Sequence, residues 1–154
     1  MLLEKIAGER FVGLRRNAPC KNSVVQVFDH DDTLTMKPQG FDNKGMTKDD
    51  FFDAARDFPP NPAVLELLQM LVADGDRIAI ATARPPERLQ ETVAWLDKYN
   101  VPFDSIMHSN GDEPSGVVKQ EMLLYLQQDY QEVATLFDDS QYNCEGARMQ
   151  GISA

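Results

Sequence analysis

The sequence predicts an α/β fold, a Rossmann-like three-layer sandwich with a central parallel sheet. Short apolar runs of strand length alternate along the chain with longer runs whose apolar residues have helical spacing. Neither an internal repeat nor a low-complexity segment interrupts this alternation. Alternating strands and helices form parallel sheets that are covered on both faces through right-handed crossovers. Because 154 residues are close to the usual size of one domain, we expect a single domain over residues 1–154.

The first third of the chain holds one clear strand and one insert. Residues 1–17 predict a loose amphipathic helix or an extended lead-in. The run Val24–Phe28 is rich in β-branched and aromatic residues, which predicts a short buried strand. Residues 35–60 are too few for an independent cap domain, so we expect a flap with a small helix over residues 48–56. Thr47 is the expected N-cap of that helix.

The remaining elements follow in regular alternation. Asn61 and Pro62 are a typical helix start, and Asp74-Gly75-Asp76 ends the helix that they begin. The later expected elements are a strand over 77–81, a helix over 85–99, a strand over 103–107, a helix over 117–130, a strand over 133–137, a helix over 142–149 and a strand stub at Ile152.

Composition limits the possible partners. The formal net charge of −10 argues against a broad nucleic-acid-binding surface, although one phosphate end could still bind at a metal-charged pocket. No apolar run is long enough to span a bilayer, and charges interrupt the apolar N-terminal stretch, unlike in a secretory signal. We therefore expect a cytoplasmic protein without membrane contact. Cys20 and Cys144 lack ligand spacing and are expected to be free thiols. The oligomeric state stays open.

Polar residues stand where three of the predicted strands end. They are Asp29 and Asp31 after the first strand, Thr82 at the end of the second, and Asp138 and Asp139 after the fourth. Parallel strands bring their carboxyl ends to one edge of a sheet, so these side chains are expected to share one site, together with Lys119 from a helix. Each has a structural alternative: an acidic turn, a helix cap or a solvated lysine. Their joint occurrence in this order favours the site.

Four segments resemble the motifs of the haloacid-dehalogenase-like (HAD) phosphohydrolases. VVQVFDHDDTL at 24–34 resembles the first motif, ATAR at 81–84 the second, Lys119 in SGVVKQEMLLYL the third, and LFDDSQYN at 136–143 the fourth. Asn61-Pro62, Arg84 and the acidic loop over 109–116 are also similar to the 3′-phosphatase domain of phage polynucleotide kinase-phosphatases. The resemblance implies the HAD-like version of the fold, with the flap in place of a full cap domain.

A cation is expected among the aspartates. Two unit charges 4 Å apart repel by about 4 kcal/mol at an effective dielectric of about 20. Carboxylate oxygens without histidine or cysteine ligands favour Mg²⁺, and His30 and His108 do not form a zinc set. The expected metal ligands are Asp29, Asp31, Asp138 and Asp139.

The resemblance also implies roles for the other residues. Asp29 would attack phosphorus and form an aspartyl-phosphate, and Asp31 would protonate the leaving alcohol and then activate water. Thr82 and Lys119 would hold the phosphate oxygens. For His30, a substrate contact and a packing role are both open. Arg84 is a candidate for binding a second phosphate, with a salt bridge to Glu87 or Glu91 as the alternative.

The predicted function is a magnesium-dependent phosphomonoester hydrolase, acting on a polynucleotide 3′-phosphate end. A small phosphorylated metabolite or nucleotide is the alternative substrate, and the lack of base-stacking aromatics near the motifs leaves this choice open. A receiver-type phosphoacceptor, which signals through a stable phospho-aspartate, is a different class. It fits less well because the third strand ends at Met107-His108 without an aspartate. A catalytically silent binding domain is unattractive because the motif residues are intact. No GxxxxGK[ST] loop occurs, so we expect no kinase domain.

Overall fold

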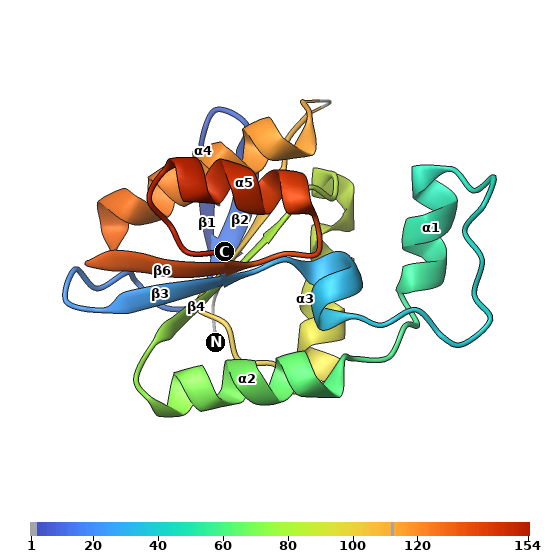
Figure 1. The fold of residues 1–154 in the computed structure, drawn as a ribbon, viewed down its shortest axis with the longest axis horizontal. Helices are drawn as coiled ribbons and strands as arrows, with labels where there is room; N and C mark the ends of the chain where they lie inside the picture. The colour runs from blue at the N-terminus through green and yellow to red at the C-terminus, as the bar shows by residue number, and fades with distance from the viewer. Residues whose placement is uncertain (1–2, 112) are drawn as a thin grey trace.

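The computed structural model describes residues 3–111 and 113–154, and these form a six-stranded sheet with helices on both faces (Figure 1). The strand order is β1-β2-β5-β4-β3-β6. The strands are β1 (Glu4–Ala7), β2 (Phe11–Arg15), β3 (Val24–Phe28), β4 (Arg77–Thr82), β5 (Ser105–Ser109) and β6 (Glu132–Phe137). The helices are α1 (Lys48–Ala55), α2 (Pro62–Ala73), α3 (Leu89–Lys98), α4 (Ser115–Asp129) and α5 (Gln141–Met149).

The predicted parallel sheet is confirmed for four strands. β3 lies between β4 and β6, and β4 also pairs with β5, all in parallel. β3 is buried from Val25 onward, which explains its continuous apolar sequence, because a central parallel strand has protein on both faces. The carboxyl ends of β3, β4 and β6 therefore meet at one edge.

The N-terminal segment is extended, which is one of the two predicted alternatives, and not helical. Its described part forms the hairpin β1–β2, and β2 pairs antiparallel with β5, so the sheet is mixed rather than purely parallel. Gly13 permits this pairing, since a Cβ at this position would meet the Ile106 carbonyl oxygen at 1.9 Å. The sequence pattern could not separate a helix from strands, because scattered apolar residues suit a half-buried hairpin equally well. Phe11 and Leu14 of this hairpin are buried.

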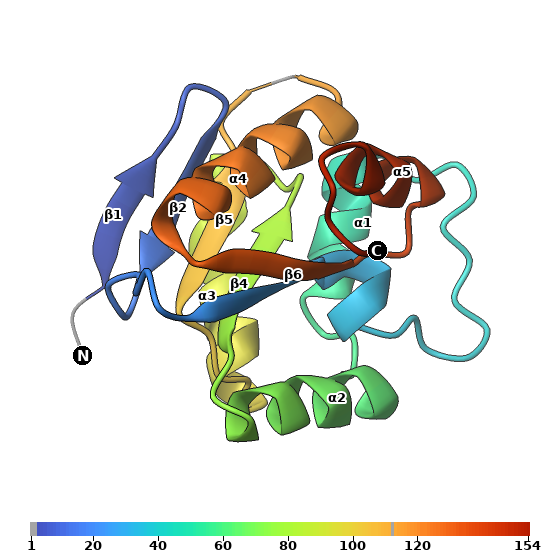
Figure 2. The ribbon, with the colours of Figure 1, turned by 60° about the vertical axis from the view of Figure 1, so that its left-hand side comes forward.

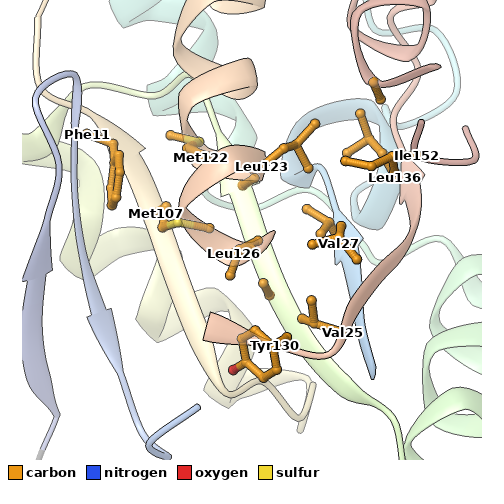
Figure 3. Close-up of a cluster of buried hydrophobic side chains, with 14 of the residues drawn as sticks. Phe11, Val25, Val27, Met107, Met122, Leu123, Leu126, Tyr130, Leu136 and Ile152 are labelled. Atoms are coloured by element: carbon orange, nitrogen blue, oxygen red, sulfur yellow. The ribbon is translucent and has the colours of Figure 1, made fainter. Parts of the chain in front are cut away.

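Two apolar layers fill the space between the sheet and its helices. One layer joins α4 to the sheet and includes Phe11, Val27, Met107 and Leu126 (Figure 3). The other joins α2 and α3 to the opposite face around Phe28. Figures 1 and 2 show α4 and α5 on one side of the sheet and α2 on the other, which is the predicted three-layer arrangement. None of the helices among the described residues has the length and apolar character needed to cross a membrane.

The insert over residues 35–60 contains α1, which stands out beside the layered body (Figure 1). The Thr47 hydroxyl accepts a hydrogen bond from the Asp50 N–H, which confirms the predicted cap. α2 likewise begins at Pro62 with Asn61 as its cap. β5 begins two residues later than predicted because Phe103 packs into the core and Asp104 turns back to β4, where its carboxylate accepts from the Ile78 N–H.

Candidate active site

The site begins with Asp29, the first residue after β3. Its backbone N–H donates to the Phe137 carbonyl at 2.8 Å, which continues the pairing between β3 and β6 by one residue. This contact places Asp29 beside Asp138, which follows β6. Carboxylate oxygens of Asp29, Asp138 and Asp139 lie within 4.8 Å of one another. The predicted convergence of these three aspartates at the sheet edge is therefore what the structure shows.

Lys119 on α4 joins two of these carboxylates. Its Nζ lies 2.6 Å from Asp29 Oδ1 and 2.5 Å from Asp138 Oδ2, and the side chain is buried. Burial alone would lower the pKa of Lys119, but the attraction of Asp29 and Asp138 outweighs it and raises that pKa. The lysine therefore stays protonated and supplies a fixed positive charge at the site.

Asp29 itself is buried, with 6 % of its surface exposed. Burial raises the pKa of this carboxyl group, Lys119 opposes the rise and the charge of Asp138 adds to it. A further positive charge at this position would favour the ionised form of Asp29.

Three residues that the sequence analysis did not assign to the site also hold the aspartates. The Thr33 hydroxyl donates to Asp29 Oδ2 at 3.2 Å. Asp138 accepts from the Ser140 N–H at 2.9 Å and from Asn143 Nδ2 at 3.1 Å. All three lie inside the motif segments 24–34 and 136–143, so the segments carried the signal, but nothing in the sequence separates these residues from their neighbours.

A tight turn, η1 (His30–Leu34), separates the two aspartates of the first motif. Asp32 within it has φ 62°, a left-handed conformation that aspartate tolerates better than most residues. The turn directs Asp31 away from the three clustered carboxylates and toward Arg84, which donates to it at 2.7 and 2.8 Å. The prediction that the Asp31 carboxylate joins the metal cluster is therefore wrong for this arrangement.

The Asp31–Arg84 pair lies mostly inside the protein. Burial would raise the pKa of Asp31, but the hydrogen bonds from Arg84 together with the charge interactions with Arg84 and the two histidines hold that pKa below its usual value. Arg84 is only 2 % exposed and also donates to the Thr92 hydroxyl at 3.4 Å. The partner of Arg84 is thus Asp31, and the alternative of a salt bridge to Glu87 or Glu91 is corrected. The two hydrogen bonds to Asp31 place Arg84 to orient that carboxylate, and its contact with a second phosphate stays a prediction.

His30 is part of the core. Its ring has no exposed surface and packs edge-on against Trp95, with centroids 4.8 Å apart. Burial lowers the pKa of His30 to about 3, so the ring is neutral. The packing role is the alternative that the structure supports, and the predicted substrate contact is corrected.

Thr82 occupies the end of β4, at the same edge as the aspartates. Its side chain is buried and its oxygen accepts from the Arg84 N–H at 3.2 Å. This bond leaves the hydroxyl hydrogen free to point into the cavity that Thr82 lines together with Asp29 and Lys119.

The cavity has a volume of about 930 Å³ and opens between the sheet edge and α1. The sheet side contributes the motif residues, and the opposite side contributes Phe51 and Phe52 from α1. Phe51 and Phe52 belong to the flap helix and lie outside the motif segments in the sequence. Folding brings these rings to the site, so the expected lack of aromatics is corrected.

The donor chemistry fits a hard divalent cation. Three carboxylates within reach of one point, with no histidine or cysteine among them, are typical ligands of Mg²⁺. Asp29, Asp138 and Asp139 would hold such an ion.

Comparisons with solved structures identify the fold. The chain is similar to a chain of the Pnkp1/Rnl/Hen1 RNA repair complex, with TM-score 0.73, 19% identity, and coverage of 90% of this chain and 43% of that one. A class C acid phosphatase from Bacillus anthracis gives TM-score 0.64 and 16% identity over 80% of this chain and 54% of that chain. A protein described as a HAD-like phosphatase from Mesorhizobium loti gives TM-score 0.64 and 8% identity over 96% and 78%.

These similarities confirm the predicted HAD-like fold. A second structure of a Pnkp1/Rnl/Hen1 complex also matches. The chain spans 43% and 47% of the matched chains in these two structures, less than half of their length. No family model matches the sequence, and no curated protein matches it.

Proposed function

We propose that this HAD-like domain is a magnesium-dependent phosphomonoester hydrolase that acts through an aspartyl-phosphate on Asp29. The observation that carries the proposal is the setting of the Asp29 carboxylate. It is buried at a sheet edge, 2.6 Å from the Lys119 ammonium, in contact range of two further aspartates, and yet lines an open cavity. A nucleophile must be both held in place and reachable by substrate, and Asp29 meets both conditions.

The reaction would take place in two halves. In the first, an Asp29 oxygen bonds to phosphorus, the phosphorus–oxygen ester bond breaks, and the leaving oxygen takes a proton from Asp31. In the second, Asp31 takes a proton from water, the water oxygen bonds to phosphorus, and the bond to Asp29 breaks, so that inorganic phosphate leaves and Asp29 is restored. Asp31 starts and ends in the same protonation state.

The neighbouring residues support these steps through charge and position. Lys119 offsets the repulsion between the Asp29 carboxylate and the phosphate oxygens. Thr82 would donate its hydroxyl hydrogen to one of those oxygens. Arg84 fixes the direction in which Asp31 faces the leaving group through its two hydrogen bonds. Bound Mg²⁺ would neutralise negative charge on the phosphate oxygens during transfer.

For the substrate, we propose a polynucleotide 3′-phosphate end, with a small phosphorylated metabolite or nucleotide as the alternative. The first is supported by the fold shared with a chain of an RNA repair complex. The second is supported by the acidic overall charge, which disfavours a long polyanion. A receiver-type phosphoacceptor fits less well, because the described end of β5 carries no aspartate.

Replacement of the nucleophile tests the proposal. Asp29→Asn is expected to lower magnesium-dependent phosphate release from an aryl phosphate by about 10³-fold or more, since the amide cannot form the intermediate. Asp32→Asn is the matched control, because it removes one carboxylate from the same turn and asparagine tolerates its positive φ.

The control variant should keep activity within about threefold, because Asp32 takes no part in the proposed reaction steps. Continuous turnover by the wild type would separate a hydrolase from a receiver, which holds its phosphate. Retention of a tenth of the activity by Asp29→Asn, or a single turnover by the wild type, would overturn the proposal.

A further inference from the structure

The aromatic side of the cavity has no role in the chemistry proposed above. Phe51 and Phe52 are half-buried, and both line the cavity from α1. Their rings stand at 66° to each other with centroids 5.9 Å apart. Phe51 also packs edge-on against Phe58, which is buried, and this contact fixes the position of the pair. Two supported aromatic rings facing a cavity form a surface on which a flat ligand ring can stack.

The aromatic pair lies on the side of the cavity toward which the leaving group would point. The Arg84 guanidinium carbon lies 5.2 Å from the centre of the Phe52 ring, and the same guanidinium holds Asp31. In the proposed function, Asp31 protonates the oxygen of the leaving group. The rest of the leaving group therefore extends from Asp31 toward the neighbouring aromatic surface.

The size and charge of the cavity restrict that leaving group further. A volume of about 930 Å³ is at the upper end of small-molecule sites, much larger than a phosphate needs. The outer lining carries Asp32, Asp49, Glu87 and Glu113. The cations Arg84 and Lys119 are already paired with aspartates, and among the described lining residues Lys48 of α1 is a single exposed cation beside these four carboxylates. Additional phosphates on the substrate would therefore meet negative charge, whereas an uncharged group would not.

We propose that Phe51 and Phe52 stack on an aromatic ring of the leaving group, and that the phosphate is carried by a nucleoside. This inference rests on the proposed phosphatase function and names its substrate class. A nucleoside joins an uncharged sugar to a flat base, so it matches both the aromatic surface and the acidic rim. The nucleoside can be a free nucleotide or the terminal residue of a strand, since both present the same base and sugar.

A pair of substrates with and without the base tests the stacking. We compare kcat/KM for a nucleoside 3′-monophosphate and for ribose 3-phosphate in the presence of Mg²⁺. The base is expected to raise kcat/KM by about 5- to 100-fold, the range that base–aromatic stacking gives by alanine substitution. Phe51→Leu and Phe52→Leu should remove most of this advantage while leaving the rate on ribose phosphate nearly unchanged.

Phe41→Leu is the matched control. Phe41 belongs to the same group of rings, with its centroid 4.8 Å from that of Phe58, but it does not line the cavity. The control should keep the wild-type preference for the nucleotide. Because the preference is a ratio measured on one preparation, partial unfolding of a variant lowers both rates and leaves the ratio intact.

The outcomes separate the inference from the function beneath it. Hydrolysis of both esters with equal kcat/KM, or an unchanged preference in both phenylalanine variants, would overturn the stacking role and leave the phosphatase standing. No hydrolysis of either ester would overturn the phosphatase and this inference together. A further arm with a 3′-phosphorylated trinucleotide distinguishes the two sources, because the acidic rim should make the strand end the poorer substrate if free nucleotides are the natural ones.

Discussion

The two walls of the cavity are built in different ways. On the sheet side, the charged groups are buried: the side chains of Lys119, Asp29 and Asp138 are 4%, 9% and 1% exposed. On the flap side, the charged partners that hold α1 lie in solvent, with Asp49 and Asp53 at 78% and 60% exposure. Buried charges interact strongly and have few alternative positions, whereas exposed pairs are screened. In the proposed function, the reacting groups therefore lie among buried charges, and the proposed stacking rings lie on a helix held by exposed ones.

The flap is joined to the body mainly through Arg88, which lies in the short turn η2 (Pro86–Arg88). Arg88 donates to Asp53 at 2.7 Å, and pairs with Asp49 at 3.3 Å and Glu91 at 3.1 Å. Trp95 forms a second joint, a buried hydrogen bond from its Nε1 to the Phe58 carbonyl at 2.9 Å. Arg56, at the end of α1, also pairs with Glu91 of α3 at 2.6 Å. Salt can weaken the ion pairs but not the Trp95 hydrogen bond.

The largest effect is expected on the sheet side, from Lys119→Met. Loss of the ammonium leaves Asp29 and Asp138 as an unpaired buried pair, and removal of one partner from such a set costs about 3–5 kcal/mol of stability. We also expect kcat to fall by about 10²- to 10³-fold, as when other charge-stabilising groups are removed. Urea unfolding and steady-state kinetics measure the two effects.

Magnesium sharpens this prediction. In the variant, added Mg²⁺ should recover part of the lost stability because the ion takes over the neutralisation of the two carboxylates. Lys48→Met is the control, since Lys48 lines the same cavity but is exposed on α1. Equal effects of the two substitutions would contradict the distinction between the walls.

A smaller effect is expected from Arg84→Lys. Lysine keeps the charge but cannot make two parallel hydrogen bonds to Asp31, so we expect kcat to fall by about 10-fold or more. Arg84 holds the pKa of Asp31 below its usual value, and Asp31 must be protonated to serve the leaving group in the proposed reaction. The alkaline limb of the kcat/KM profile should therefore move to higher pH in the variant. A lower rate with an unmoved alkaline limb would show that Arg84 acts otherwise than through Asp31.

Acid should weaken the body of the protein through its buried histidines. Burial lowers the pKa of His108 to about 4, despite the hydrogen bond from its Nδ1–H to the Pro85 carbonyl. The unfolded chain takes up this proton near pH 6.5, so stability is complete above that pH and falls as pH decreases toward 4. The slope is about 1.4 kcal/mol per pH unit for each such proton.

Chemical denaturation between pH 7 and pH 4.5 measures this loss. His30, with a pKa of about 3, contributes in the same direction. His108→Gln should show a shallower pH dependence than the wild type. An unfolding free energy that stays constant through this range would contradict the buried, neutral state of both rings.

The smallest effect is expected on the flap side, from Arg88→Gln. The ion pairs of Arg88 with Asp49 and Asp53 are largely exposed, so their loss should change stability by less than about 1 kcal/mol. KM for a nucleotide should rise a few fold while kcat is kept, because α1 carries the aromatic surface and no reacting group. Added salt should raise KM of the wild type toward that of the variant. A loss of kcat as large as that of Lys119→Met would remove the distinction between the walls.

The sequence predicted the sheet-side wall far better than the flap-side wall. Asp29, Thr82 and Asp138 were found because each follows an apolar strand, and parallel pairing brings strand ends together whatever the loops do. The sequence could not predict that the Asp31 carboxylate pairs with Arg84 and lies outside the group of three carboxylates, because this pair joins the ends of β3 and β4 in space.

The flap and the N-terminus were harder because their contacts are tertiary. The flap helix itself was predicted, but the sequence does not show which of its side chains, here Phe51 and Phe52, line the cavity. The hairpin β1–β2 was missed because strands at a sheet edge carry a weak apolar pattern and depend on a distant partner, here β5.

That distant pairing also bears on the order in which the molecule assembles. Phe11 and its ladder partner Ser109 are far apart in the sequence, so Phe11 leaves the ribosome well before Ser109 is made. Contacts between residues so far apart in sequence form late, because the entropy cost of closing a long loop comes before the stabilisation that the contacts provide. We therefore expect the hairpin β1–β2 to join the sheet only after β5 has formed. Slow folding or chaperone binding should be seen first in this segment.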